Sequence, residues 1–308
     1  MKQKRSETMG LSQVELQQLI SIGDLSELTG ITPDTIRAWE RRYGKPVPIR
    51  LPSGHRRYSR KDIPWLRRVA ESLARGHRPS KVLCLTKEDL DSLLFPEAMK
   101  WQDDPKLKAI LEHARHFRTR KIREELAQYR GQNDVKTFLQ DVVSPLLAFL
   151  GRSWADGVLE IRHEHFLSSL LEDELRTIRA SIETNGGPLI VFATLSDENH
   201  GLGLQMAAII AALNKMRVRM VGVNTPISEI LGAVREIKAD AVALSISVST
   251  GGAETDRMLA ELRKDLPPHV RIGVGGAGAR GPRRGPRGID YFNDFKSFET
   301  WLHSLENL

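Results

Sequence analysis

The stretch Glu198-Asn199-His200-Gly201-Leu202-Gly203 decides the fold of the second half of this 308-residue chain. It follows the apolar run 189–195, which is a strand candidate. After a gap of 41 residues comes Ser245-Ile246-Ser247, at the end of another strand candidate, and after 27 more comes Gly275-Gly276, behind a third. An imidazole, small hydroxyl side chains and a glycine pair at three strand ends would together form a deep slot.

Strands and helices alternate strictly over residues 187–308. The expected strands cover 189–195, 217–223, 241–248, 271–274 and 289–292, and the expected helices cover 203–214, 227–238, 253–265 and 295–306. Near-continuous apolar strands separated by helices predict a doubly wound parallel sheet. Ligands of such sheets bind beyond the carboxyl ends of the strands, where the slot residues fall.

The rest of the chain divides into three segments. Residues 19–85 carry short helical patterns around a turn-rich, basic middle. Residues 86–104 are acidic with one proline and indicate a linker that holds at most a short helix. Residues 105–186 show long apolar periodicity without strand signals, which predicts a four-helix bundle. The expected fold class is therefore multidomain, α and α/β.

The net charge of +7 is concentrated at one end of the chain. Residues 1–85 hold 17 Lys and Arg against 8 Asp and Glu, whereas the remainder is slightly acidic. Such a distribution indicates that one module meets a polyanion. No apolar run reaches the roughly 18 residues of a membrane span. A single cysteine, Cys84, excludes an internal disulfide and favours a reducing compartment, so we expect a cytoplasmic protein.

Residues 22–43 have the pattern of a helix-turn-helix. A short amphipathic helix ends at Gly30, Thr32 is a good N-cap, and Pro33 takes the favoured first helical position. The second helix is expected at 35–43. The following segment, 46–58, is a proline-bounded hairpin rich in Arg and His, which we expect to project toward phosphates as a wing.

The run Ile36-Arg-Ala-Trp-Glu-Arg-Arg-Tyr-Gly44, together with Gly54-His-Arg-Arg-Tyr-Ser59, resembles the MerR family of winged-helix regulators. The resemblance implies that Arg37 and Arg41 or Arg42 lie at the major groove of a double-stranded DNA operator. It also implies DNA backbone or minor-groove contacts by the following residues: Arg50, His55, Arg56 and Tyr58. The apolar residues at helical spacing are expected in the core, namely Ile22, Leu25, Leu28, Ile36 and Trp39.

MerR proteins usually dimerise through a long helix after the DNA-binding segment. Here that region is the acidic linker, which lacks heptads, so self-association must come from further along the chain. Operators of such proteins show two-fold or repeated half-sites, which implies a homo-oligomer, either dimer or tetramer.

The pattern Glu-x-His-x-x-Gly, Ser-x-Ser and Gly-Gly resembles the cobalamin-binding fold of methionine synthase and the corrinoid carrier proteins. The resemblance implies that His200 is the lower axial ligand of cobalt. Glu198, two residues earlier, is placed to accept the other ring N–H. The tail of the cofactor is then expected to meet Gly203, Ser245, Ser247, Gly275 and Gly276. Leucine is usual where this chain has Ser247.

Trp154, followed after nine residues by Glu164-His165, resembles the bundle motif of the CarH/LitR group of light-responsive repressors. In that group the Trp covers the upper corrin face and the Glu-His pair meets the adenosyl group. A helical wheel places Glu164 on the apolar arc of its helix and His165 off it. A histidine usually follows the Trp and can cap cobalt after photolysis, but this chain has Ala155.

The resemblances imply a transcriptional repressor that senses light through adenosylcobalamin, with methylcobalamin as a second possible form. A first alternative is a regulator of the same architecture that no longer binds cobalamin, which Ser247 and Ala155 favour. A second is a corrinoid carrier for an enzyme, which the winged helix and the lack of a substrate barrel disfavour. No catalytic motif supports an enzyme.

Overall fold

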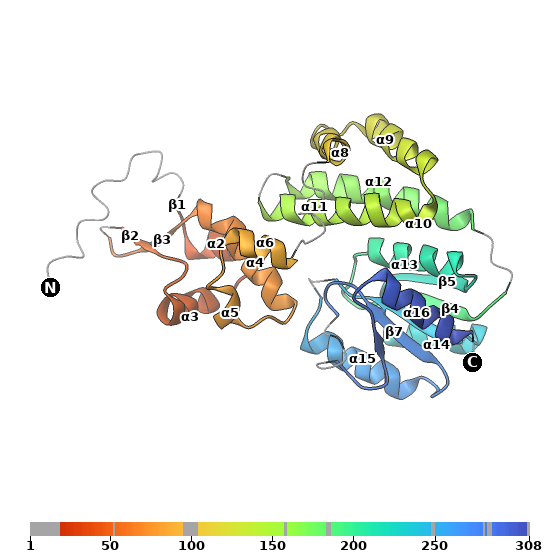
Figure 1. Cartoon of the computed structure of the whole chain (residues 1–308). Helices are drawn as coiled ribbons and strands as arrows, with labels where there is room; N and C mark the ends of the chain where they lie inside the picture. The colour runs from red at the N-terminus through yellow and green to blue at the C-terminus, as the bar shows by residue number, and fades with distance from the viewer. Residues whose placement is uncertain are drawn as a thin grey trace. The chain divides into compact units, whose positions relative to one another are not determined.

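The computed structural model describes residues 19–51, 53–94, 104–156, 159–182, 186–247, 250–279, 281 and 285–306, without the side chains of residues 74, 154 and 155. The chain divides into two compact units (Figure 1). The first holds residues 1–73, 77–102 and 147–160. The second holds residues 74–76, 103–146 and 161–308.

The first unit is built from short helices and a small antiparallel sheet. Its first elements are β1 (Leu19–Ile20), α2 (Ile22–Thr29), α3 (Pro33–Tyr43), β2 (Ile49–Arg50) and β3 (Arg56–Ser59). They are followed by η1 (Arg60–Asp62), α4 (Ile63–Ala74), α5 (Pro79–Val82) and α6 (Lys87–Leu94). The sheet order is β1-β3-β2, so the β2–β3 hairpin forms the predicted wing.

Local capping explains where α2 and α3 begin and end. Ser21 and Asp24 form a capping box at the start of α2, and Gly30 ends the helix with φ 70°, a left-handed conformation that favours glycine. The Thr32 side chain accepts a hydrogen bond from the Thr35 amide at 3.3 Å, and Pro33 is the first residue of α3. The predicted N-cap and the predicted turn are both confirmed.

The core of this unit contains the predicted apolar residues, together with side chains that come from α4 and α6. Leu25, Ile36 and Trp39 are buried, and Ile22 and Leu28 pack against them. Leu90 of α6 is fully buried in the same cluster. The compact part of the unit therefore extends past residue 85, and the expectation that residues 86–94 are a linker is wrong. The rest of that expected linker, 95–103, lies outside the described residues.

The segment after residue 104 is helical, as predicted. Its elements are α8 (Pro105–Arg115), α9 (Thr119–Gln132), α10 (Val135–Phe138), the π-helical turn η2 (Leu139–Val143), α11 (Ser144–Ala155) and α12 (Ile161–Ala180). A bundle of four helices stays a prediction. Within the second unit, α12 packs along α13 of the sheet domain, and Arg179 donates to Gln205 at 3.0 Å across this contact.

Five parallel strands form the sheet of the second unit: β4 (Leu189–Leu195), β5 (Arg217–Thr225), β6 (Ala241–Ser245), β7 (Arg271–Gly275) and β8 (Asp290–Tyr291). The helices between and after them are α13 (Leu202–Leu213), α14 (Ile227–Ile237), α15 (Ala253–Asp265) and α16 (Phe295–Leu305). Helix α13 packs with α16, and α14 packs with α15 (Figure 1). The predicted doubly wound sheet is confirmed, with boundaries that agree to within three residues.

The strand order is β5-β4-β6-β7-β8, with β4 between β5 and β6 and buried along its whole length. The chain leaves β4 toward one neighbour and returns on the other side to form β6. The boundary between β4 and β6 is therefore a topological switch point, the place at which open α/β sheets generally bind their ligands. The loops after β4 and β6 carry the predicted site residues.

Replacing Leu90 with Ala tests whether α6 belongs to the first core. Because Leu90 is fully buried, the change should lower the free energy of unfolding by about 2–5 kcal/mol. Leu93 lies on the same helix but is 38% exposed, so Leu93→Ala should change it by less than about 1 kcal/mol. Urea denaturation followed by circular dichroism measures both values, and equal losses would contradict the assignment.

Candidate functional site

The Glu198 carboxylate lies at this switch point, in the loop between β4 and α13. Its Oε1 accepts hydrogen bonds from the His200 amide at 2.9 Å and from His200 Nδ1 at 2.7 Å. Its Oε2 accepts from the Ser247 amide at 2.6 Å and from the Thr250 hydroxyl. One carboxylate therefore joins the loop after β4 to the loop after β6.

Glu198 is only 2% exposed, yet its hydrogen-bond partners favour the ionised form. Burial raises the pKa of this carboxyl, but the hydrogen bonds from His200, Thr250 and Ser247 outweigh burial and lower the pKa to about 2. A buried carboxylate is stable only when donors replace its lost hydration. The four donors meet that requirement, so the charge is retained and the loop geometry is fixed.

The His200 ring is anchored on one nitrogen and open to solvent elsewhere. Its side chain is 63% exposed, and Nδ1 faces Glu198. The hydrogen bond with Glu198 raises the pKa of His200, burial opposes this, and the charges of Glu198 and Glu164 add to the rise. In the neutral ring the Glu198 carboxylate holds the proton on Nδ1, which leaves the lone pair on Nε2. The ring thus fits the role of a single axial ligand to a metal ion.

The loop that carries His200 is itself supported from β4 and β5. The Thr194 hydroxyl donates to the Glu198 carbonyl at 2.6 Å and accepts from the Asn224 amide at 2.8 Å. The Asn224 side chain accepts from the Asp197 amide at 2.8 Å. Thr194 and Thr250 are not among the site residues predicted from the sequence. The sequence could have indicated Thr194, because it is a hydroxyl residue inside the otherwise apolar run 189–195. No sequence pattern distinguishes Thr250.

Two of the predicted small residues, Gly203 and Ser245, lie next to each other. A Cβ added at Gly203, in the first turn of α13, would lie 3.0 Å from the Ser245 hydroxyl oxygen. Gly203 therefore leaves room for the Ser245 hydroxyl at the end of β6. At Gly275 an added Cβ would meet nothing closer than Phe292 at 4.0 Å. The surrounding protein atoms therefore do not require a glycine at this position.

The loop after β7 packs backbone to backbone against the loop after β6. Gly276 has φ 98°, and an added Cβ would lie 2.3 Å from the Ile246 carbonyl oxygen. Gly278, which the sequence analysis did not single out, is tighter still, because its Cβ would lie 1.9 Å from the Ser247 carbonyl oxygen. The sequence Gly275-Gly276-Ala277-Gly278 is therefore the relevant motif, with Gly276 and Gly278 as the residues that permit close approach.

Glu164 lies on α12, where its charge contributes to the raised pKa of His200. Its Oε1 accepts from the Ser168 hydroxyl at 2.7 Å, so the glutamate on the apolar arc has a local partner. His165 is 74% exposed and its Nδ1 is 3.4 Å from Glu164 Oε2. Glu164 is thus one of the charges that raise the pKa of His200, and His165 lies beside Glu164.

His163 is buried and packs against the ring of Phe117, with the ring centroids 5.2 Å apart. It is therefore a core side chain of the helical segment, and only a movement of α12 would release it. Trp154 and Ala155 lie in the last turn of α11, but their side chains are outside the described part of the structure. The role predicted for Trp154 stays a prediction.

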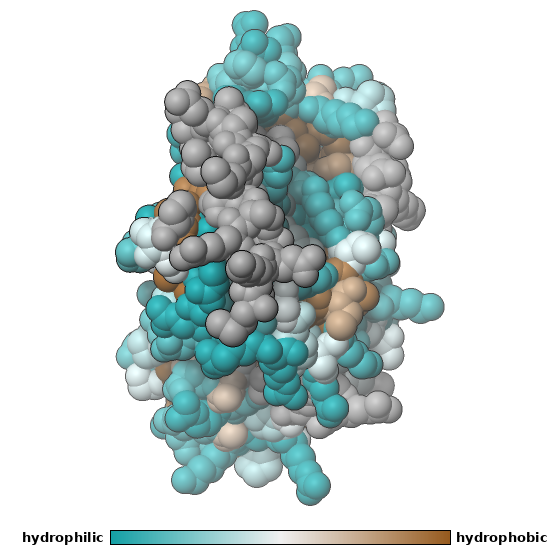
Figure 2. All heavy atoms as spheres, turned by 90° about the vertical axis from the view of Figure 1, so that its left-hand side faces the viewer, coloured by the Kyte–Doolittle hydropathy of each residue, from teal (hydrophilic) through white to brown (hydrophobic). Residues whose placement is uncertain are grey.

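The predicted DNA-contacting arginines of α3 lie on its exposed side. Arg37 is paired with Asp34 at 2.8 Å, and Arg41 and Arg42 are exposed, whereas Ile36 and Trp39 are buried. The wing adds further exposed basic residues, namely Arg50, His55 and Arg56. The side of the molecule on which α3, β2 and β3 lie is largely hydrophilic where its residues are described (Figure 2).

Tyr58 does not belong to this surface, and the prediction that it contacts DNA is wrong. It is fully buried, and its hydroxyl donates to Oε1 of Glu40 on α3. Glu40 Oε2 also lies 3.3 Å from Arg56 Nε. Glu40 thus connects the wing strand β3 to α3, so Tyr58 and Arg56 fix the orientation of these two elements relative to each other.

Two family descriptions match separate parts of the chain. Residues 21–58 match the family described as MerR family regulatory protein, and residues 188–292 match the B12 binding domain. The chain is a MerR-type DNA-binding regulator with a B12-binding domain. No helix in the described part of the chain combines the length and hydropathy needed to span a membrane.

Two relatives are similar over most of this chain. It is 27% identical over 267 residues to the HTH-type transcriptional repressor CarH of Myxococcus xanthus. This match covers 83% of this chain and 88% of that protein. It is 28% identical over 264 residues to the repressor CarA of the same organism, covering 85% and 88%. The Methanosarcina barkeri monomethylamine corrinoid protein shares the fold, with a TM-score of 0.53, 12% identity, and coverage of 64% of this chain and 96% of that one.

Replacing Glu198 with Gln should lower the pKa of His200 toward its ordinary value of 6.5, because the hydrogen bond and the negative charge that favour the protonated ring are both lost. NMR titration of the imidazole signals in the cofactor-free protein measures this pKa. Glu229→Gln, on the exposed side of α14, is the matched control and should leave it unchanged. Identical titration curves for wild type and Glu198→Gln would contradict the assigned contact.

Proposed function

We propose that this protein is a transcriptional repressor that binds adenosylcobalamin in the dark and releases DNA in the light. The observation that supports cofactor binding best is the Glu198–His200 pair, with an anchored Nδ1 and an exposed ring, at the switch point of a B12-binding domain. The observation that supports DNA binding is the winged helix with its exposed arginines. Repression rather than activation is proposed because both similar proteins, CarH and CarA, are repressors.

In this proposal His200 would hold cobalt through Nε2, and Glu198 would keep the ring in the correct tautomer. The residues that would hold the nucleotide tail are Ser245 and Ser247, with the glycines at 203, 275 and 276. Glu164, His165 and Trp154 would lie at the upper ligand. When bound, adenosylcobalamin supplies a Co–C bond that light can break. The residues of α12 that would surround this bond are Glu164 and His165.

DNA binding is assigned to α3 and the wing. Arg37 and Arg41 or Arg42 contact base edges in the major groove, and the exposed wing residues contact the phosphate backbone. The excess positive charge of residues 1–85 supplies the electrostatic part of the affinity, which therefore falls steeply with salt. A homo-oligomer on a two-fold or repeated operator places several such wings on DNA together.

The alternative, a regulator of this architecture without cobalamin, depends on two departures from the family pattern. The structure weakens one of them, because Ser247 supports Glu198 through its backbone amide, which any residue at this position except proline can provide. Ala155 affects only the form reached after light exposure, since the usual second capping histidine is absent there. The colour of the purified protein distinguishes the two proposals, because a protein that retains cobalamin is coloured and one that does not bind it is colourless.

His200→Ala should abolish the absorption bands of base-coordinated cobalamin and weaken cofactor retention by about 10-fold or more. The reason is that the imidazole aligned by Glu198 is lost. Absorption spectra after mixing with adenosylcobalamin and gel filtration measure both effects. The exposed His269, in the loop before β7, supplies the control, since His269→Ala should bind as wild type does. Equal spectra for the two variants would refute the axial assignment.

In darkness, adenosylcobalamin should raise DNA affinity, and green light should remove the increase. Fluorescence anisotropy with a duplex that the wild-type protein selects from a random-sequence library measures both states. Arg41→Ala should weaken binding in the dark by about 1–3 kcal/mol, because it removes a groove contact of α3. Equal affinity before and after illumination would rule out the light response while leaving cobalamin binding intact.

A further inference from the structure

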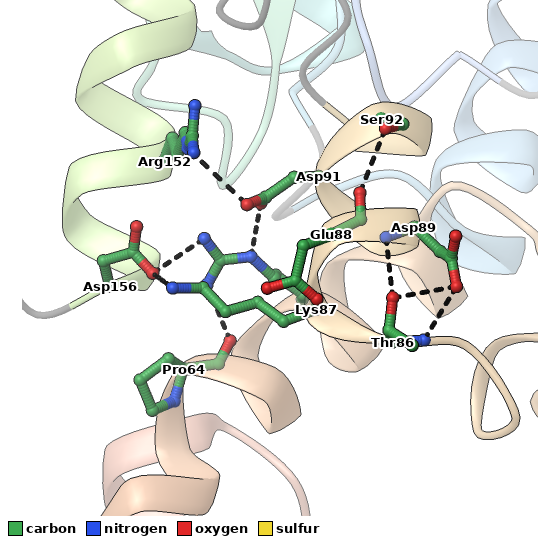
Figure 3. A network of polar contacts seen from close by, with 10 residues as sticks. Pro64, Thr86, Lys87, Glu88, Asp89, Asp91, Ser92, Arg152 and Asp156 are labelled. Carbon is green, nitrogen blue, oxygen red and sulfur yellow. Dashed lines mark hydrogen bonds and ion pairs between the residues drawn. The ribbon is translucent and has the colours of Figure 1, made fainter. Parts of the chain in front are cut away.

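A buried arginine joins three helices of the first unit. Arg68 lies on α4 and is fully buried. Its Nε donates to Asp91 Oδ1 on α6, its Nη1 donates to the Pro64 carbonyl at 2.9 Å, and its Nη2 donates to Asp156 Oδ1 at 2.8 Å (Figure 3). Asp156 immediately follows α11. The guanidinium therefore connects the helix after the wing to the end of α11.

Further charges make this joint specific. Lys87 Nζ lies 2.6 Å from Asp156 Oδ1, and Arg152 Nε lies 3.5 Å from Asp91 Oδ2 (Figure 3). A carboxylate at the C-terminal end of a helix is repelled by the helix dipole, so α11 itself does not stabilise Asp156. The cations of α4 and α6 do so. Because the charge of Arg68 is buried, it in turn requires both aspartates.

The other end of the same helical run is attached to the B12-binding domain. Elements α10, η2 and α11 follow one another without a break from Val135 to Ala155. Lys136, in α10, pairs at 2.7 Å with Glu299 of α16, within the second unit. The division between the two units falls after residue 146, three residues beyond the π-helical turn η2. Such turns interrupt the regular hydrogen-bond ladder and often mark functional positions.

We propose that the helical run 135–155 transmits cofactor occupancy to the DNA-binding unit, and that the Arg68–Asp156 contact is its attachment to α4. The proposal rests on the function proposed above. Leu66 and Val69 of α4 lie in the same core as Ile36 of α3, so a displacement of Arg68 acts on the helix that packs beneath the DNA-facing one. Asp156 is a positioning residue in this scheme and touches neither cofactor nor DNA.

The test compares Asp156→Asn with Asp173→Asn in the full chain. The first substitution keeps the size of the side chain but removes the charge that Arg68 and Lys87 require. Asp173, on α12, forms only an exposed 3.7 Å pair with Arg123 among the ion pairs of the described residues, so its change is the control. Each protein is titrated with adenosylcobalamin by absorption. Its affinity for the selected duplex is then measured in the dark, with and without the cofactor.

Wild type and Asp173→Asn should show a cofactor-dependent change in DNA affinity of about 5-fold or more, the size typical of coupled sites. In Asp156→Asn this ratio should fall toward one, while the affinity for adenosylcobalamin stays within about 3-fold of wild type. Asp156→Glu should restore part of the ratio. An unchanged ratio in Asp156→Asn overturns the proposal, whereas failure of the wild type to bind adenosylcobalamin defeats the proposed function instead.

A second measurement uses only the wild-type chain and so does not depend on the folding of a variant. Hydrogen exchange is followed with and without adenosylcobalamin, in the dark and without DNA. The proposal expects altered exchange in α11 and also in α4, the helix that carries Arg68. A change confined to the second unit, with α4 unaltered, overturns the proposal.

Discussion

The structure of the candidate cofactor site depends on one buried anion. Glu198 is placed at the switch point of the sheet, where a bare carboxylate would be strongly destabilising. Four donors from three residues, His200, Ser247 and Thr250, remove that penalty. Because those donors come from the loops after β4 and β6, the charge holds both loops in one arrangement. The position of the imidazole follows from this constraint rather than from packing around its own ring.

Much of the fold follows from local patterns in the sequence. The apolar run of β4 and the periodicity of α15 predict their boundaries without error, because each pattern is complete within its own element. The Glu198–His200 contact is also predictable, since it spans two residues. Thr250 and Gly278 are not, because Thr250 meets Glu198 across 52 residues and Gly278 meets Ser247 across 31. No periodicity marks such pairs.

The two wrong predictions share a cause. Tyr58 stands among exposed basic residues, so its surroundings in the sequence indicate a surface position, but Glu40, 18 residues earlier, provides the partner that a buried hydroxyl requires. The acidic segment after residue 85 indicates solvent exposure, yet Asp91 is buried because Arg68 neutralises it. In both places a polar group is buried by a partner distant in the sequence, which composition does not reveal.

Buried charges thus recur at both functional ends of the chain, as Glu198 in the cofactor domain and Arg68 in the DNA-binding unit. Replacing such groups with apolar residues often costs little stability, and in some proteins their contribution is to specify one arrangement over others. When the partners of a buried ion come from separate segments, few arrangements satisfy all of its hydrogen bonds and ion pairs. A segment that moves must therefore break several of these contacts at once. This property suits the proposed transmission, because buried ions with several partners favour discrete arrangements over a continuous range.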